Sequence, residues 1–169
     1  MIITIIGLFH LIHSPVLILL PFYIKNSLFD MIYINYFFLI MISYTFLNGE
    51  CPISYTSKLM LNNNYIAGEN ICYYPEMLTV LPNNKCISYY FGAMTGLYMF
   101  SLFYVIYRSN ILLCIYLLIP FFTLLIYFLF IHNILLNKRS SYFIIFQKIT
   151  KYVLCFSVLF IIKKYTEIL

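Results

Sequence analysis

The sequence predicts an all-α protein: a transmembrane helix bundle that crosses the membrane several times. Only 9% of its 169 residues are charged and 64% are hydrophobic, whereas a soluble domain carries about 25% charged residues. The apolar residues also occur in runs that can cross a bilayer, for which about 20 residues suffice. These observations indicate a single domain, residues 1–169, with four spans and a fifth block whose placement has two alternatives.

The first two spans lie at the start of the chain. Residues 2–24 form an uncharged apolar run, and the basic segment that begins a secretory signal is missing, so we expect this run to be retained as a span. The second run covers residues 29–47 and has Asp30 near its start. Its length is sufficient to cross the hydrocarbon core.

A long polar loop, residues 48–88, follows the second span. It holds three of the five cysteines, and their spacing fits no zinc pattern, so we expect no metal site. A disulfide among them requires an oxidising compartment. Within the loop, residues 71–81 are apolar but too short to cross, which predicts an interfacial or re-entrant segment.

The remaining spans occupy the second half of the chain. Residues 89–107 and 111–131 are predicted to cross, the latter with a kink at Pro120. Residues 142–162 are ambiguous because Lys148 and Lys151 lie in their first half, and a charge at depth costs roughly 2.5–3.5 kcal/mol. This block is therefore either a fifth span or a helix lying in the interface.

The distribution of Lys and Arg predicts the orientation of the bundle. With the N-terminus in the cytosol, the cytosolic side receives loop 48–88 and the basic connector at Lys138 and Arg139. If residues 142–162 do not cross, the basic C-terminal tail also lies on the cytosolic side and adds to its positive charge. The basic residues indicate membrane anchoring and no nucleic-acid partner. The expected partner is the lipid bilayer, with self-association or a larger membrane complex as further alternatives.

Two groups of polar residues are candidates for function. His10 and His13 are three residues apart on one helix face, where they could bind a metal or relay protons, or form hydrogen bonds as neutral side chains. Glu50 and Cys51 place a carboxylate beside a thiol where the second span ends. A neighbouring carboxylate raises a thiol pKa, so we expect a structural turn here and a poorly reactive Cys51.

Gly92 and Gly96 form a Gly-x-x-x-Gly motif in the third span. Small residues at this spacing let another helix approach closely. The motif predicts a packing face, either within the chain or between two copies of it.

One segment resembles a known group of proteins. The sequence Gly49-Glu50-Cys51-Pro52-Ile53-Ser54-Tyr55, with Lys58, Asn63–Gly68 and the preceding Asp30, is similar to uncharacterised small multi-pass membrane proteins of large DNA viruses. A fainter similarity links it to bacterial membrane proteins in which Cys-Pro-Leu-Thr follows an apolar helix. The resemblance covers residues 30–68 and implies a membrane protein, with no activity attached.

The sequence contains no established catalytic motif, and we expect no cofactor. The first functional hypothesis is a non-enzymatic, membrane-organising protein, which the resemblance suggests is viral. The alternative is a small membrane enzyme, redox carrier or transporter subunit that uses His10, His13, Glu50 and Cys51. A common pocket for His10, His13, Asp30 and Glu50 would favour the alternative, and scattered positions would favour the first hypothesis.

Overall fold

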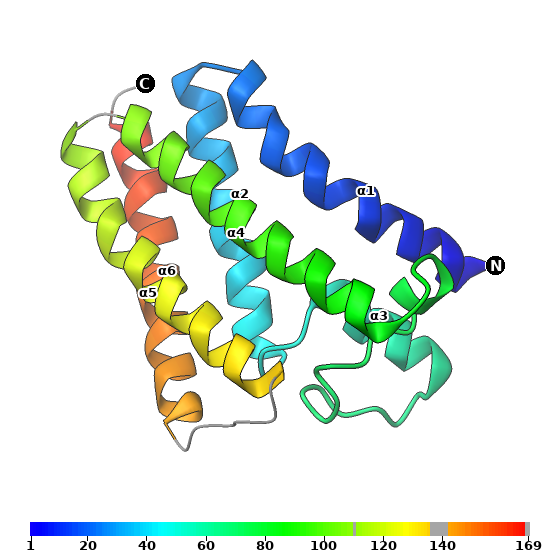
Figure 1. Cartoon of the computed structure of the whole chain (residues 1–169). Helices are drawn as coiled ribbons and strands as arrows, with labels where there is room; N and C mark the ends of the chain where they lie inside the picture. The colour runs from blue at the N-terminus through cyan, green and yellow to red at the C-terminus, as the bar shows by residue number, and fades with distance from the viewer. Residues whose placement is uncertain (110, 136–141, 168–169) are drawn as a thin grey trace.

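The computed structural model describes residues 1–109, 111–135 and 142–167, which contain helices and no strands. This confirms the predicted all-α class. The helices and their bounds are α1 (Ile2–Tyr23), α2 (Ser27–Phe46), α3 (Pro52–Leu61), the 3-10 helix η1 (Met77–Thr79), α4 (Asn84–Arg108), α5 (Ile111–Leu135) and α6 (Phe143–Thr166) (Figure 1).

Four of the described helices are long and apolar enough to cross a membrane. They are α1, α2, α4 and the Phe143–Lys164 part of α6. In α5 the apolar stretch among the described residues is Tyr116–Ile131. The chain is therefore an integral membrane protein. α6 packs along α2 and α5 as a member of the bundle, which favours a fifth span over a helix lying in the interface.

The hydrophobic core is shared by α2, α4, α5 and α6. Fully buried side chains from each of them, including Phe38, Leu102, Leu124 and Leu154, form one cluster. α1 contributes no residue to this cluster. The core is thus a four-helix unit, and α1 is an additional helix on its outside.

α1 leaves the bundle at an angle. It is joined to α2 by a tight turn, but the two helices diverge toward the N-terminus, where α1 lies against α3 and η1 (Figure 1). Its buried residues, Gly7, His10, Ser14, Ile18 and Pro21, are spaced three or four apart and so form a single stripe. This stripe brings His10 to the segment between α2 and α4.

That segment is more structured than the sequence predicts. α3 occupies part of the predicted loop 48–88, beginning with Pro52 at the first helical position, where its fixed backbone angle is favourable. Residues 71–81 form turns and η1 against α1. α4 begins five residues before the predicted span because the Asn83 side chain accepts a hydrogen bond from the Cys86 N–H (3.0 Å).

The prediction that Gly92 and Gly96 form a packing face within the chain is wrong. A Cβ atom added at either position meets no atom of the described residues within 4 Å. Both glycines are exposed on the outer surface of α4, so contact with a second copy stays a prediction. Close packing occurs instead at Gly7, where an added Cβ would lie 2.2 Å from the Glu76 carbonyl oxygen.

Candidate active site

Cys51, His10 and Glu76 form a connected polar cluster beneath α1. The Cys51 Sγ lies 3.6 Å from His10 Nε2, and His10 Nδ1 lies 3.1 Å from Glu76 Oε1. All three are nearly inaccessible, with exposed fractions of 7%, 4% and 0%. A thiol, an imidazole and a carboxylate connected in this order are the arrangement of a nucleophile, its base and the group that orients the base.

A tight turn after α2 positions Cys51. Asn48 and Gly49 both have left-handed backbone conformations (φ 55° and 91°), which glycine and asparagine tolerate best. The turn places Cys51 at the N-cap of α3. The positive end of the helix dipole at this position favours a thiolate.

Gly7 and η1 position the other two members. Because Gly7 has no side chain, the Glu76 backbone approaches α1 one helical turn before His10. The Thr79 hydroxyl at the end of η1 donates a hydrogen bond to the Glu76 carbonyl (2.7 Å) at its start and so stabilises this turn. The Glu76 side chain consequently reaches the imidazole on the inner face of α1.

The environment of Cys51 favours its thiolate. Burial, the largest single cause, raises the pKa of the Cys51 thiol, whereas the hydrogen bond and charge of His10 lower it. The Tyr44 hydroxyl and the Ser54 N–H lower it further, so the net pKa of Cys51 lies below its usual value. Glu50 is not among the groups that shift this pKa, so the expected rise of the Cys51 pKa through Glu50 is wrong, whereas the low reactivity of Cys51 stays a prediction.

The two oxygens of Glu76 have different surroundings. Oε1 accepts hydrogen bonds from the Ser54 hydroxyl (2.5 Å) and from His10. Oε2 is buried and has no hydrogen-bond partner among the described residues. Phe91 packs on His10 and on Tyr74, with ring centroids 5.2 and 4.6 Å apart. An aromatic ring thus covers His10, and one acceptor oxygen of Glu76 is unused among the described residues.

Glu50 points away from Cys51 and anchors the loop that follows α3. Its carboxylate pairs with the Lys58 ammonium and accepts from the Tyr65 hydroxyl (3.0 Å) and the Gly68 N–H (2.9 Å). Lys58 also donates to the Asn70 carbonyl (2.5 Å). Glu50 and Lys58 are 0% and 3% exposed, so this is a buried and well-satisfied ion pair.

The other sequence candidates lie apart from this cluster. His13 Nε2 forms a hydrogen bond with the Tyr36 hydroxyl (2.9 Å) on a more exposed part of α1. Asp30 pairs with Arg108, whose Nε lies 2.9 Å from Oδ2, near the turn between α1 and α2. His10, His13, Asp30 and Glu50 therefore do not share one pocket. The structure combines His10 with Cys51 and adds Glu76, which the sequence analysis did not single out.

The three residues lie 41 and 66 positions apart along the chain, so no local motif could have indicated them. A weak signal was available, since acidic residues are scarce in this chain and Glu76 lies in an apolar segment.

Among the described residues, no group of three or more His, Cys, Asp or Glu is placed to hold a metal ion. The four described cysteines, Cys51, Cys72, Cys86 and Cys155, are free thiols.

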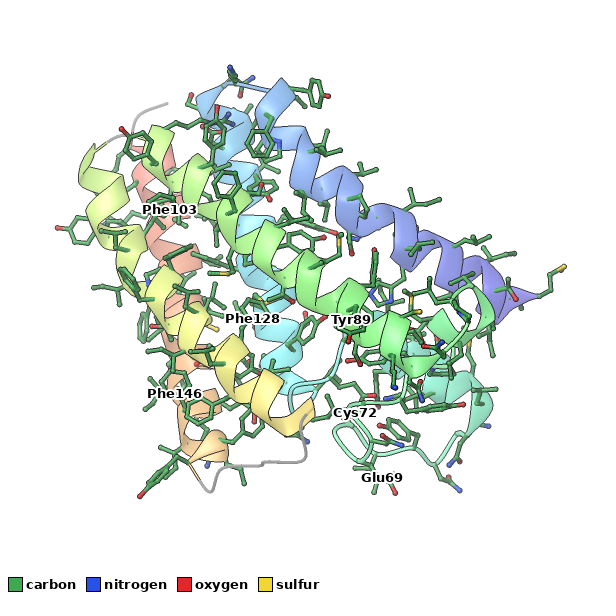
Figure 2. All side chains as sticks on the ribbon, viewed as in Figure 1. Glu69, Cys72, Tyr89, Phe103, Phe128 and Phe146 are labelled. Atoms are coloured by element: carbon green, nitrogen blue, oxygen red, sulfur yellow. The ribbon has the colours of Figure 1, made fainter. Side chains whose placement is uncertain are left out.

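Figure 2 shows Cys72 and Glu69 on the loop between α3 and α4. Cys72 is exposed. Its sulfur is nevertheless partly shielded from water, which raises the pKa of Cys72, and nearby Lys58 only partly offsets the effect. Cys72 is therefore an accessible but unactivated thiol, against which Cys51 can be compared.

Comparison with protein-family models, curated proteins and solved structures gives no match to this chain.

Proposed function

We propose that this membrane protein is a thiol-dependent enzyme in which Cys51 is the nucleophile, His10 the general base and acid, and Glu76 the group that orients His10. The observation that carries the proposal is the connected geometry of the three side chains at 3.6 and 3.1 Å. Acyl transfer or hydrolysis suits these groups best, because a thiolate and an imidazolium supply the attack and the proton without a cofactor.

The lowered pKa of Cys51 supports this assignment. The thiolate is the reactive form of cysteine, so a lower pKa keeps a larger fraction of it reactive near neutral pH. Glu76 holds the imidazole through Nδ1, which leaves Nε2 facing the sulfur. The Ser54 hydroxyl holds Glu76 in turn.

The test is the pH dependence of alkylation of the full chain by iodoacetamide in mild detergent, followed for each cysteine by peptide mass spectrometry. Because thiolate reacts, the Cys51 rate should persist as pH falls below about 8.5, the ordinary thiol pKa, while the Cys72 rate declines. The shape of each profile reports the pKa and is independent of how easily the reagent enters.

Two variants complete the test. His10→Ala should move the Cys51 profile to higher pH and leave the Cys72 profile in place, and Glu76→Gln should move it in the same direction by less. If the pH profiles of Cys51 and Cys72 alkylation are identical in the unaltered protein, the proposed enzymatic role of Cys51 is contradicted.

The second candidate is the non-enzymatic, membrane-organising role that the resemblance to viral membrane proteins implies. Two observations favour it. The four polar candidates named from the sequence do not share one pocket, and Cys51, His10 and Glu76 are almost completely buried. In this case the cluster connects α1 to α3 and η1 by hydrogen bonds, and its role is to fix α1 on the core. An ordinary pKa for Cys51, together with loss of folding in His10→Ala, is the result expected from this candidate.

A further inference from the structure

We propose that a groove between α5 and α6 binds an anionic phospholipid, with one acyl chain in the groove and the head-group phosphate on Lys163 and Lys164. This site is separate from the Cys51 cluster and does not depend on the proposed enzyme. Its support comes from the shape of the groove, its length and the charges at one of its ends.

The groove lies where α5 and α6 run side by side (Figure 1) and has a volume of about 510 Å³. Leu117 and Pro120 of α5 line it and are buried. Ile119 of α5 and Phe156 of α6 also line it, but these side chains are 64% and 70% exposed. The buried residues therefore form the floor and the exposed residues the two rims, so the groove opens on the outer surface of the bundle.

The surface of the groove suits an apolar chain. Its lining is made largely of aliphatic and aromatic side chains. The Ser157 hydroxyl donates to the Val153 carbonyl (2.7 Å), so its proton is used within α6. Because α6 is long and apolar enough to cross a membrane, its exposed apolar side chains face the hydrocarbon, where acyl chains surround the protein.

The length of the groove matches one leaflet of the bilayer. Along α6 its lining extends from Ile149 to Phe160, which is about 17 Å at a rise of about 1.5 Å per residue. The hydrocarbon core is about 30 Å thick, so one leaflet takes up about 15 Å of it. An acyl chain that starts at one membrane surface can therefore fill the groove and end near the middle of the bilayer.

Two lysines lie beyond the end of the groove at which Tyr116 contacts Phe160, with ring centroids 4.8 Å apart. Lys163 and Lys164 follow Phe160 by three and four residues, so they lie one helical turn beyond it on the same side of α6. Lys164 also interacts electrostatically with Tyr116 of the neighbouring helix. The two ammonium groups are thus placed where the phosphate of a lipid would lie if its chain filled the groove.

Glu167 only partly balances the charge of these lysines. Its carboxylate lies 4.0 Å from Lys163 Nζ and 2.9 Å from Lys164 Nζ, and all three side chains are exposed. Exposed ion pairs contribute little to stability, so a phosphate can share the lysines with Glu167 or replace it. Two lysines and one glutamate leave a positive charge at this end, which attracts an anionic head group.

The test uses the absence of tryptophan from the chain. Phe156→Trp places a single tryptophan on a rim of the groove, and Leu39→Trp, the control, places one on the 52% exposed side of α2. Each protein is placed in zwitterionic liposomes that contain increasing fractions of a phospholipid with brominated acyl chains, either anionic or zwitterionic. Bromine in contact with tryptophan quenches its fluorescence, so quenching reports which lipid lies beside each position.

For Phe156→Trp, half-maximal quenching should need about tenfold less of the anionic than of the zwitterionic brominated lipid, because each lysine near the surface attracts anionic lipid. Leu39→Trp should show no such preference. Equal quenching of Phe156→Trp by the two lipids would show contact with bulk lipid only and would overturn the proposal. No quenching by either lipid would show that a second copy or another protein covers the groove, which would also overturn it.

The head-group contact is tested in the Phe156→Trp protein. Lys163→Gln combined with Lys164→Gln should remove the preference for anionic lipid. Lys25→Gln combined with Lys85→Gln removes the same charge at exposed positions elsewhere and should leave the preference unchanged. A preference that persists without Lys163 and Lys164 would overturn the proposed site.

A second tryptophan position covers the case in which Phe156→Trp does not fold, as judged by detergent extraction. Ile119→Trp lies on the opposite rim of the groove, on α5, and should show the same preference and the same dependence on Lys163 and Lys164.

Discussion

At the scale of single residues, the closest approach between distant parts of the chain depends on the missing side chain of Gly7. A Cβ atom at this position would lie 2.2 Å from the Glu76 carbonyl oxygen and 3.2 Å from the Thr79 hydroxyl oxygen. The first of these contacts is with backbone, which cannot rotate away as a side chain can. Gly7 is thus a requirement of the site, because it sets the position from which Glu76 reaches His10.

We therefore predict that Gly7→Ala lowers stability by about 1–3 kcal/mol, the usual cost of overpacking, and raises the pKa of Cys51 because His10 loses its alignment. Gly92→Ala is the matched control, since an added Cβ there has open space. The measurements are the thermal loss of folded protein in mild detergent and the pH profile of Cys51 alkylation. Equal stability of the two variants would show that η1 does not pack on α1 as described.

The turn at Glu50 and Cys51 shows what local sequence can predict at this scale. Gly49 and Pro52 correctly predict a chain that turns as it leaves α2. The partner of Glu50 is close in sequence, because Lys58 lies eight residues away, and local reasoning could indicate it. The partner of Cys51 is distant, because His10 lies 41 residues away, and local reasoning could not indicate it. The effect of Glu50 on the thiol was overestimated because adjacency in sequence does not fix the direction of a side chain.

At the scale of whole helices, two backbone carbonyls of α1 accept hydrogen bonds from side chains of α4. Pro15 has no N–H, so the Leu11 carbonyl lacks its usual helical donor. The Tyr90 hydroxyl of α4 donates to this carbonyl (2.8 Å). Further along, the Ser101 hydroxyl donates to the Ile18 carbonyl (3.1 Å). In a bilayer, where water cannot satisfy a free carbonyl, such donors fix the place of the helix.

Tyr90→Phe should therefore lower stability by about 1 kcal/mol, because it leaves the Leu11 carbonyl without a donor. Tyr89→Phe is the matched control: it is the neighbouring residue, and its side chain is 78% exposed. The stability of each variant is measured as the fraction of protein that stays folded after heating in detergent to increasing temperatures. If Tyr89→Phe costs as much as Tyr90→Phe, the hydrogen bond to α1 is not the cause.

The helices themselves were largely predictable from the apolar runs, because in a bilayer length and hydropathy are the dominant constraint. α1 and α2 begin and end within two residues of the predicted spans. α3 was missed because a short helix with Ser, Thr and Lys lacks the long apolar signal. It is stabilised by tertiary contacts, with Ser54 and Lys58 both buried.

At the scale of the whole molecule, the helix order determines which segments share an end of the bundle. The N-terminus, α3 and the start of α6 lie toward one end, and the turn between α1 and α2 and the end of α4 lie toward the other (Figure 1). The described Lys and Arg residues divide evenly, with Lys58, Lys85, Lys148 and Lys151 toward the first end and Lys25, Arg108, Lys163 and Lys164 toward the second. The predicted cytosolic N-terminus thus depends on Lys138 and Arg139, which lie outside the described residues.

We predict five crossings, with Cys72 and residue 167 on opposite sides of the membrane and Cys72 in the cytosol. The reason is that α6 packs along α2 within the core and is long and apolar enough to cross. Glu167→Cys, in which an exposed side chain is replaced, should react with an impermeant maleimide added outside intact cells, and Cys72 should react only after permeabilisation. Peptide mass spectrometry assigns each label. Labelling of both from one side would place α6 in the interface, and labelling of Cys72 from outside would reverse the orientation while leaving the number of crossings intact.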